Sequence, residues 1–93
     1  MPTYVALAKW TDQGRQKVAS IADRIDEVRQ QGEQMGVKTV GHYVTMGRFD
    51  QVVVMEAPDD ETMARMLLVV AGRGNAETET LRAWPIEEVR GLI

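Results

Sequence analysis

The apolar positions of the first third of the chain predict one strand and one helix. Residues 4–8 form a short continuous apolar run, which is typical of a buried strand. Residues 11–14 have the sequence Thr-Asp-Gln-Gly, which supplies a turn and an N-cap. Apolar residues then recur at helical spacing until Met35-Gly36. The pattern therefore predicts one long helix from Thr11 or Asp12 to Met35.

The rest of the chain predicts a hairpin, a second helix and a last strand. Apolar and polar residues alternate over residues 37–46, and residues 50–57 are apolar in their centre. This pattern indicates two strands joined by a tight turn at Gly47-Arg48. Pro58 and the acidic residues after it indicate a helix start. The buried stripe of this helix is predicted to contain Met63, Met66, Leu67 and Val70. A polar strand over residues 77–84 and a short helical tail over residues 86–93 follow, and the tail is expected to dock on its own or another subunit.

The resulting order, β-α-β-β-α-β, predicts one α+β domain over residues 1–93, with a ferredoxin-like four-stranded antiparallel sheet and both helices on one face. The first and third strands are central in this topology, and their continuous apolar runs fit burial on both faces. Two helices cover only one face of the sheet. We therefore expect a second copy to cover the other face, with Val52 and Val54 in the dimer interface. Assembly beyond a dimer is open.

The predicted turn also assigns side chains to the two faces. If Met46 lies opposite Phe49, alternation fixes which residues share a side. The helix-covered side is then expected to contain Val5, Leu7, Val40, His42, Val44, Met46, Phe49, Val53, Met55, Leu81 and Ala83. The open side is expected to carry aromatic, small and polar residues, a mixture typical of a small-molecule pocket. This candidate pocket comprises Tyr4, Trp10, Tyr43, Thr45, Asp50, Glu56, Thr80, Arg82 and Trp84.

Composition narrows the classes of function. The net charge of −3 gives no electrostatic footprint for nucleic acid. The chain has no Cys and one His, so neither a metal site nor a cofactor is predicted. No apolar segment approaches the roughly 20 residues that span a bilayer, and no signal peptide is seen. We expect a cytoplasmic protein without a membrane or nucleic-acid partner.

The charged residues expected on the open side have two interpretations. In the simpler one, Glu56 and Arg82 form an ion pair within a subunit or across the dimer. In the catalytic one, Asp50 or Glu56 is a general base, and Tyr43 and Arg82 stabilise developing negative charge.

Three other features also have a structural and a chemical interpretation. His42 is either a structural residue below the helices or a base or haem ligand. The acidic run at residues 59–61 is either a cation site or, as its position after Pro58 favours, a set of helix-capping residues. Pro2 would become the amino terminus after loss of Met1, as in tautomerases that use a proline amine, but the predicted antiparallel hairpin argues against that class.

Several segments resemble the GYD domain family. They are Pro2-Thr3-Tyr4-Val5, Lys9-Trp10-Thr11-Asp12-Gln13-Gly14, Thr45-Met46-Gly47-Arg48-Phe49-Asp50, Glu56-Ala57-Pro58-Asp59-Asp60-Glu61, and Gly74-Asn75 followed by Thr78-Glu79-Thr80-Leu81-Arg82-Ala83. The resemblance covers nearly the whole chain and implies a dimeric α/β barrel in which two sheets pack face to face. Phe49 stands where the family name implies Tyr, so this chain lacks a phenol at its turn.

The expected function is that of a homodimer, or a higher homo-oligomer, which binds a small, partly apolar organic ligand between the sheets. No reaction is assigned, and no catalytic residue. One alternative is a cofactor-independent enzyme acting on such a molecule, similar to the monooxygenases and isomerases that the resemblance implies as relatives. Another is a structural assembly unit whose inter-sheet space is filled by side chains.

Overall fold

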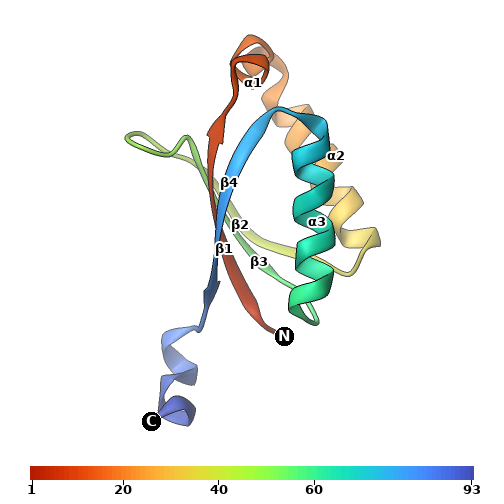
Figure 1. Cartoon of the computed structure of the whole chain (residues 1–93). Coiled ribbons are helices and arrows are strands. Elements are labelled where there is room, and N and C mark those ends of the chain that lie inside the picture. The colour runs from red at the N-terminus through yellow and green to blue at the C-terminus, as the bar shows by residue number, and fades with distance from the viewer.

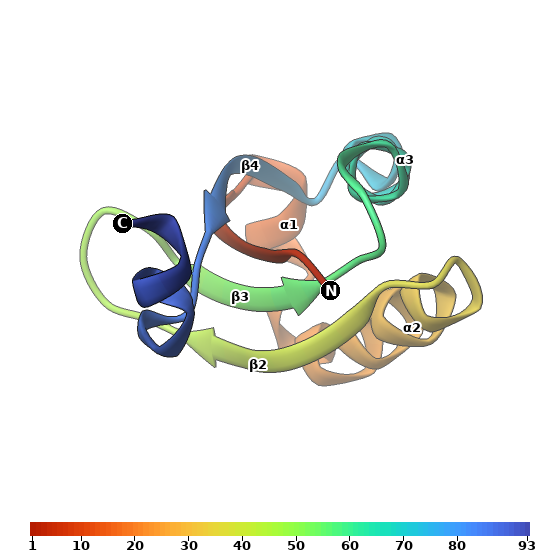
Figure 2. The ribbon, with the colours of Figure 1, turned by 90° about the horizontal axis from the view of Figure 1, so that it is seen from below.

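The computed structural model describes residues 1–93 and has the predicted α+β, ferredoxin-like fold (Figure 1). Its elements are β1 (Thr3–Trp10), α1 (Asp12–Gln16), the 3-10 helix η1 (Val18–Ser20), α2 (Ile21–Gln34), β2 (Lys38–Val44), β3 (Gln51–Glu56), α3 (Asp60–Arg73), β4 (Ala76–Ala83) and the 3-10 helix η2 (Ile86–Leu92). The four strands form an antiparallel sheet in the order β2-β3-β1-β4, so β1 and β3 are central as predicted. Helices α2 and α3 lie on the same face of this sheet (Figures 1 and 2).

The first helix is broken, whereas the sequence predicted one continuous helix. Thr11 does act as an N-cap, because its hydroxyl oxygen accepts a hydrogen bond from the Gly14 N–H at 3.1 Å. A Cβ atom on Gly14 would lie only 2.0 Å from the carbonyl oxygen of Asn75. Helix α1 therefore packs directly on the backbone that precedes β4. The chain then changes direction through η1 before α2 begins.

Helix α3 begins and ends where the sequence predicted, and it buries the predicted residues. The Asp59 carboxylate accepts a hydrogen bond from the Thr62 N–H at 2.8 Å, and this bond lowers the pKa of Asp59 below its ordinary value. Met63 and Met66 are buried, and the two remaining residues of the predicted stripe pack against them. Helix α3 ends at Gly74, which has a left-handed φ of 74°.

The β2–β3 hairpin has the predicted register near its turn. Val44 lies opposite Gln51, and the loop between them is closed by a hydrogen bond from the Thr45 N–H to the Asp50 carbonyl at 2.9 Å. Farther from the turn, an irregularity between Thr39 and Gly41 interrupts the alternation. Val40 lies at this irregularity and is 57% exposed, so its predicted place below the helices is wrong.

The two faces of β1 and β4 are opposite to the prediction. Tyr4, Ala6 and Ala8 are each less than 5% exposed and share the helix-covered face with Met55. Val5 and Leu7, which lie between them in β1, face the open side. So do Leu81 and Ala83 of β4, which lie opposite Val5 and Thr3. The reason is that β1 is apolar on both sides, so alternation alone does not say which side faces the helices. No short turn ties β1 to β3 and fixes the register, as it does in the β2–β3 hairpin.

The core lies between the sheet and the two long helices. Its buried members are Tyr4, Ala6, Val37, Met55, Ala57, Met63 and Met66. The predicted helical tail forms η2, but it does not dock on its own subunit, since Ile86 is 77% exposed and Ile93 is 99% exposed. No helix is long and apolar enough to cross a membrane.

Candidate functional site

A mainly apolar cavity lies between the sheet and helices α2 and α3. It has a volume of about 130 Å³. Its floor is made by the central strands, with Ala6 and Ala8 from β1 beside Val53 from β3. Ile25 and Val28 of α2 and Val70 of α3 line the opposite wall. The cavity exists because two alanines occupy floor positions at which larger side chains would reach the helices.

One polar pair lies in this otherwise apolar floor. Gln51 is 7% exposed, and its side-chain oxygen is 2.7 Å from Nε2 of His42 on the neighbouring strand. Both residues line the cavity. The amide nitrogen of Gln51 has no hydrogen bond to the protein, and it is not among the side-chain atoms sealed from solvent. This nitrogen is therefore a donor available to a molecule inside the cavity.

The charged residues that line the cavity are all cationic. They are Lys17, Arg24, Arg29 and Arg73, and no carboxylate lines it although the chain is acidic overall. Arg29 is paired with Asp26 at 3.0 Å, and Arg73 lies 3.4 Å from Glu27. Arg24 donates its Nε–H to the Ser20 hydroxyl at 3.0 Å, which leaves its terminal nitrogens without a partner in the protein. Lys17 forms no salt bridge.

The structure does not bring the nine residues of the predicted pocket together. Tyr4, Thr80 and Arg82 lie on the helix-covered side, whereas Tyr43 and Glu56 face the open side. The other four lie near strand ends or in the hairpin loop; these are Trp10, Thr45, Asp50 and Trp84. The inverted faces of β1 and β4 account for the separation of the first group from the second.

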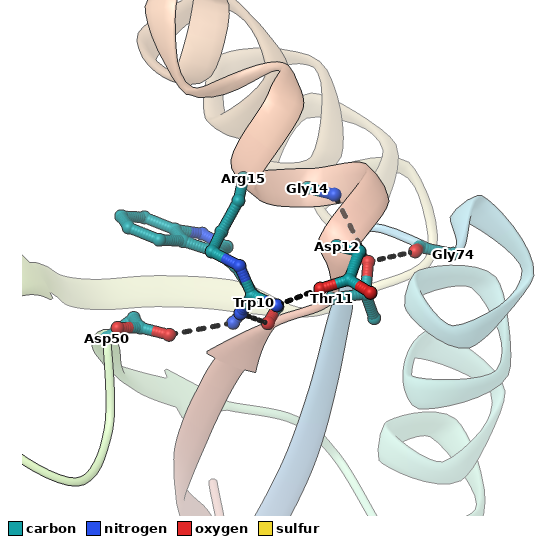
Figure 3. A network of polar contacts seen from close by, with 7 residues as sticks. All are labelled: Trp10, Thr11, Asp12, Gly14, Arg15, Asp50 and Gly74. Atoms are coloured by element: carbon teal, nitrogen blue, oxygen red, sulfur yellow. Dashed lines mark hydrogen bonds and ion pairs between the residues drawn. The ribbon is translucent and has the colours of Figure 1, made fainter.

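Asp50 has a structural role at the end of β1. Its carboxylate accepts a hydrogen bond from the Trp10 N–H at 2.9 Å (Figure 3). Arg15 donates to the Trp10 carbonyl oxygen at 2.9 Å and also pairs with Asp12. Thr11 donates its hydroxyl to the Gly74 carbonyl at 2.6 Å. This network fastens the hairpin loop, α1 and the end of α3 to the same end of the sheet.

Arg82 forms no ion pair with Glu56 within the chain, so the intrasubunit version of the simpler interpretation is wrong. The two residues lie on opposite faces of the sheet. The guanidinium of Arg82 instead lies over two rings, 4.4 Å from the centre of Trp84 and 5.4 Å from that of Tyr4. It also donates to the carbonyl oxygen of Thr3 at 3.2 Å.

The phenol of Tyr4 is held at the edge of the core. Its hydroxyl donates a hydrogen bond to the Asp60 carboxylate in the first turn of α3. Burial raises the pKa of Tyr4 above its ordinary value near 10, and the hydrogen bond to Asp60 raises it further. Tyr4 is therefore a neutral hydrogen-bond donor that fixes the start of α3 to β1.

The sequence interpretation missed Gln51 and the cavity floor as site residues. It placed His42 on the correct side of the sheet but gave it no partner. The available signal was the small size of Ala6 and Ala8 in a central strand, which indicates space below the helices, together with a glutamine inside an apolar strand.

Comparisons with known proteins place the chain in a family. Residues 4–93 match the GYD domain. The chain is 40% identical over 90 residues to the glutamine synthetase and cystathionine beta-lyase binding protein of Thermus thermophilus, covering 96% of this chain and 95% of that protein. The crystal structure of TTHA0845, also from Thermus thermophilus, has the same fold, with a TM-score of 0.56 and 20% identity over 91% of this chain and 99% of that chain. The chain thus belongs to the GYD domain family.

Proposed function

We propose that the protein is a homodimeric binding protein that forms complexes with metabolic enzymes. The observation that carries this proposal is the 40% identity, over 96% of the chain, to a protein named for binding glutamine synthetase and cystathionine beta-lyase. Glutamine synthetase is the first partner to test. We expect these complexes to form in the cytoplasm.

The open face of the sheet supports the dimer. Val5 lies opposite Val54 on one side and Leu81 on the other, and the next row contains Leu7 opposite Val52. Tyr43 of β2 continues that row and is 59% exposed. These side chains form an apolar surface over β1, β2 and β3 that reaches β4 through Leu81, and Glu79 of β4 lies at its edge opposite Leu7. Monomeric proteins seldom leave such a surface in water.

Charged residues border this apolar surface at both ends. Lys38 lies opposite Glu56 near one end, and Lys9 lies opposite Glu77 near the other. An apolar centre with a charged rim is the usual anatomy of a protein interface. Because the rim carries both signs, the face is complementary to a copy of itself rotated about a two-fold axis.

The tail also supports a partner on this side. Both η2 and the β2–β3 loop project away from α2 and α3, toward the open face (Figures 1 and 2). The tail carries apolar residues that its own subunit leaves exposed, among them Ile86 at 77% and Leu92 at 57%. A helix of this length needs a surface to pack on, and a second subunit on the open face would supply one.

Binding is favoured over catalysis because the proposed catalytic charges have other partners. Asp50 is engaged by the Trp10 N–H, and Arg82 is stacked between two rings. Glu56 lies at the rim of the open face, opposite Lys38. None of the three shares a cavity with another of them.

Sedimentation velocity tests the enzyme-binding function. The purified protein is mixed with glutamine synthetase from the same organism, each at micromolar concentration, and then with serum albumin as a control. We expect a boundary that sediments faster than either component alone in the first mixture and no such boundary in the second. Two independent boundaries in both mixtures, up to about 100 μM, would overturn this partner.

Small-molecule binding is a second candidate function, favoured by the cavity behind the sheet. We move the expected ligand site from the space between two sheets to this cavity, although Trp10 is the only one of the nine predicted pocket residues that lines it. A cavity of about 150 Å³ with apolar walls is known to hold one benzene molecule. The volume of about 130 Å³ in this chain is close to that size.

A further inference from the structure

The cavity between the sheet and the helices is apolar at one end and polar at the other. Val37, Met55 and Met66 line the end at which β1 begins. Gln51 lies opposite Ala8, near the end of β1, and Ala8 in turn lies opposite Thr78. Lys17 and Arg24 line the cavity from the start of the α2 segment, which is also at this end (Figure 1). A bound molecule thus meets an apolar wall at one end and polar groups at the other.

The polar end provides hydrogen-bond donors and no negatively charged side chain. Lys17 is unpaired, the terminal nitrogens of Arg24 are unpaired, and the amide nitrogen of Gln51 makes no bond to the protein. No Asp or Glu side chain lines the cavity. Unpaired cations beside a partly open, mainly apolar space favour an anion, whose charge they would meet with charge-assisted hydrogen bonds.

We infer that the cavity binds a small organic acid, with a six-membered ring or a branched aliphatic chain over Ala6 and Ala8 and its carboxylate toward Gln51, Lys17 and Arg24. This inference rests on the small-molecule function proposed above and names its ligand class. The volume of about 130 Å³ is close to that of a single ring, and the carboxylate would extend from the ring toward the cations at the polar end. The acid enters as its anion at neutral pH, because carboxyl groups have pKa values near 4.

Two probes of equal shape test the inference. Benzoate carries the carboxylate, whereas benzamide has the same ring and is neutral. Each is titrated into ¹⁵N-labelled protein at pH 7, and the amide signals are followed by NMR. We expect benzoate to shift the signals of Ala6, Ala8, Gln51 and Val53 in a saturable manner. We also expect benzoate to bind about tenfold more tightly than benzamide, which is the effect of one or two charge-assisted hydrogen bonds.

Matched variants distinguish the contribution of the cations to binding from that of the cavity volume. Lys17→Gln and Arg24→Gln should each weaken benzoate binding severalfold and leave benzamide binding unchanged. Arg65→Gln is the control, because Arg65 lies on α3, pairs only with Glu61 and does not line the cavity. Ala8→Leu should fill the floor and abolish binding of both probes, and circular dichroism reports whether this variant is folded. The two glutamine variants alter half-buried side chains outside the hydrophobic core and keep the test independent of that outcome.

The outcomes distinguish this inference from the function on which it rests. Equal affinity for benzoate and benzamide, with shifts at the cavity floor, would overturn the assignment of a carboxylate and leave small-molecule binding intact. No saturable shift with either probe would overturn small-molecule binding at this cavity. Shifts confined to residues outside the cavity would likewise overturn the site. The enzyme complex and the dimer are tested by other measurements and are unaffected by these results.

Discussion

The two faces of the sheet differ in the size of their side chains, in the opposite sense to a simple expectation. In β1 the helix-covered face has alanines at positions 6 and 8, and the open face has Val5 and Leu7. Met63 and Met66 of α3 belong to the same core cluster as Ala6, and the space that the two alanines leave unfilled forms part of the cavity. The larger residues of the open face gain burial only from material that another molecule supplies. Between positions 5 and 8 of β1, the larger side chains therefore lie on the face that the helices leave uncovered, whereas Tyr4 is a large residue on the covered face.

Val54→Asp is the strongest test of this difference. Val54 lies in the centre of the open face, so the substitution would bury an unpaired charge in each subunit of the dimer. We expect the dimer to dissociate to folded monomers or to aggregate, with a loss on the order of 3–5 kcal/mol for each buried charge. Sedimentation equilibrium measures the state of assembly. Leu68→Asp is the control, since Leu68 is 72% exposed on α3 and does not belong to the open face. An unchanged dimer in Val54→Asp would contradict the proposed interface.

Met63→Ala compared with Leu7→Ala tests the two faces as sources of stability. Met63 is 2% exposed on the helix-covered side, and its truncation should lower the free energy of unfolding by about 2–5 kcal/mol at every protein concentration. Leu7 is only half-buried in the single chain. Its truncation should lower stability mainly through the dimer, so that the loss depends on protein concentration. Urea denaturation at two protein concentrations distinguishes the two variants. If the loss of unfolding free energy were independent of protein concentration for both, the two faces would not differ as proposed.

Removal of residues 86–93 tests whether the tail belongs to the open-face assembly. If its exposed isoleucines pack on a partner, the dimer should weaken by about one to two orders of magnitude, because burying one such side chain contributes about 1.5–3 kcal/mol. The folded monomer should keep its unfolding temperature at high dilution. Sedimentation equilibrium gives the dissociation constant. A truncated protein that dimerises as tightly as the full chain would show that the tail packs elsewhere.

Among these variants, Tyr4→Phe is expected to have the smallest effect on the free energy of unfolding. It should also change how this free energy depends on pH in alkaline solution. Loss of the hydrogen bond to Asp60 should lower the free energy of unfolding at pH 7 by about 0.5–1.5 kcal/mol. The pKa of Tyr4 is raised in the folded state, so its contribution is complete below pH 10 and is lost as pH rises through the folded pKa. Wild type should therefore lose stability above pH 10 more steeply than the variant. Tyr43→Phe, on the exposed side, is the control and should follow wild type.

How much of the fold was predictable depended on whether a local signal fixed each feature. The hairpin register followed from a turn with Gly47 at a φ of 106°, and the start of α3 followed from Asp59. The break after α1 has no such signal, because residues 17–20 contain neither Gly nor Pro. It arises from the contact between Gly14 and Asn75, which are 61 positions apart and meet only in the folded chain.

The candidate site was less predictable than the fold. The nine pocket residues were chosen by alternation, and alternation in β1 and β4 required a long-range register that the sequence does not contain. His42 was placed on the correct face because the hairpin turn determines its position. Its partner Gln51 was overlooked, because a polar residue inside an apolar strand is recognised as part of a site only once the space beside it is known.

The two tryptophans lie in different parts of the molecule, with Trp10 lining the cavity and Trp84 stacked on Arg82 beside the tail. Their ultraviolet emission therefore reports two separate events. In a Trp84→Phe protein the remaining indole would respond to occupancy of the cavity. In a Trp10→Phe protein it would respond to changes around Arg82 and the adjoining tail, which the proposed dimer packs on its partner. Titrating both proteins with one ligand would show, by intrinsic fluorescence alone, whether filling the cavity alters how tightly the subunits hold each other.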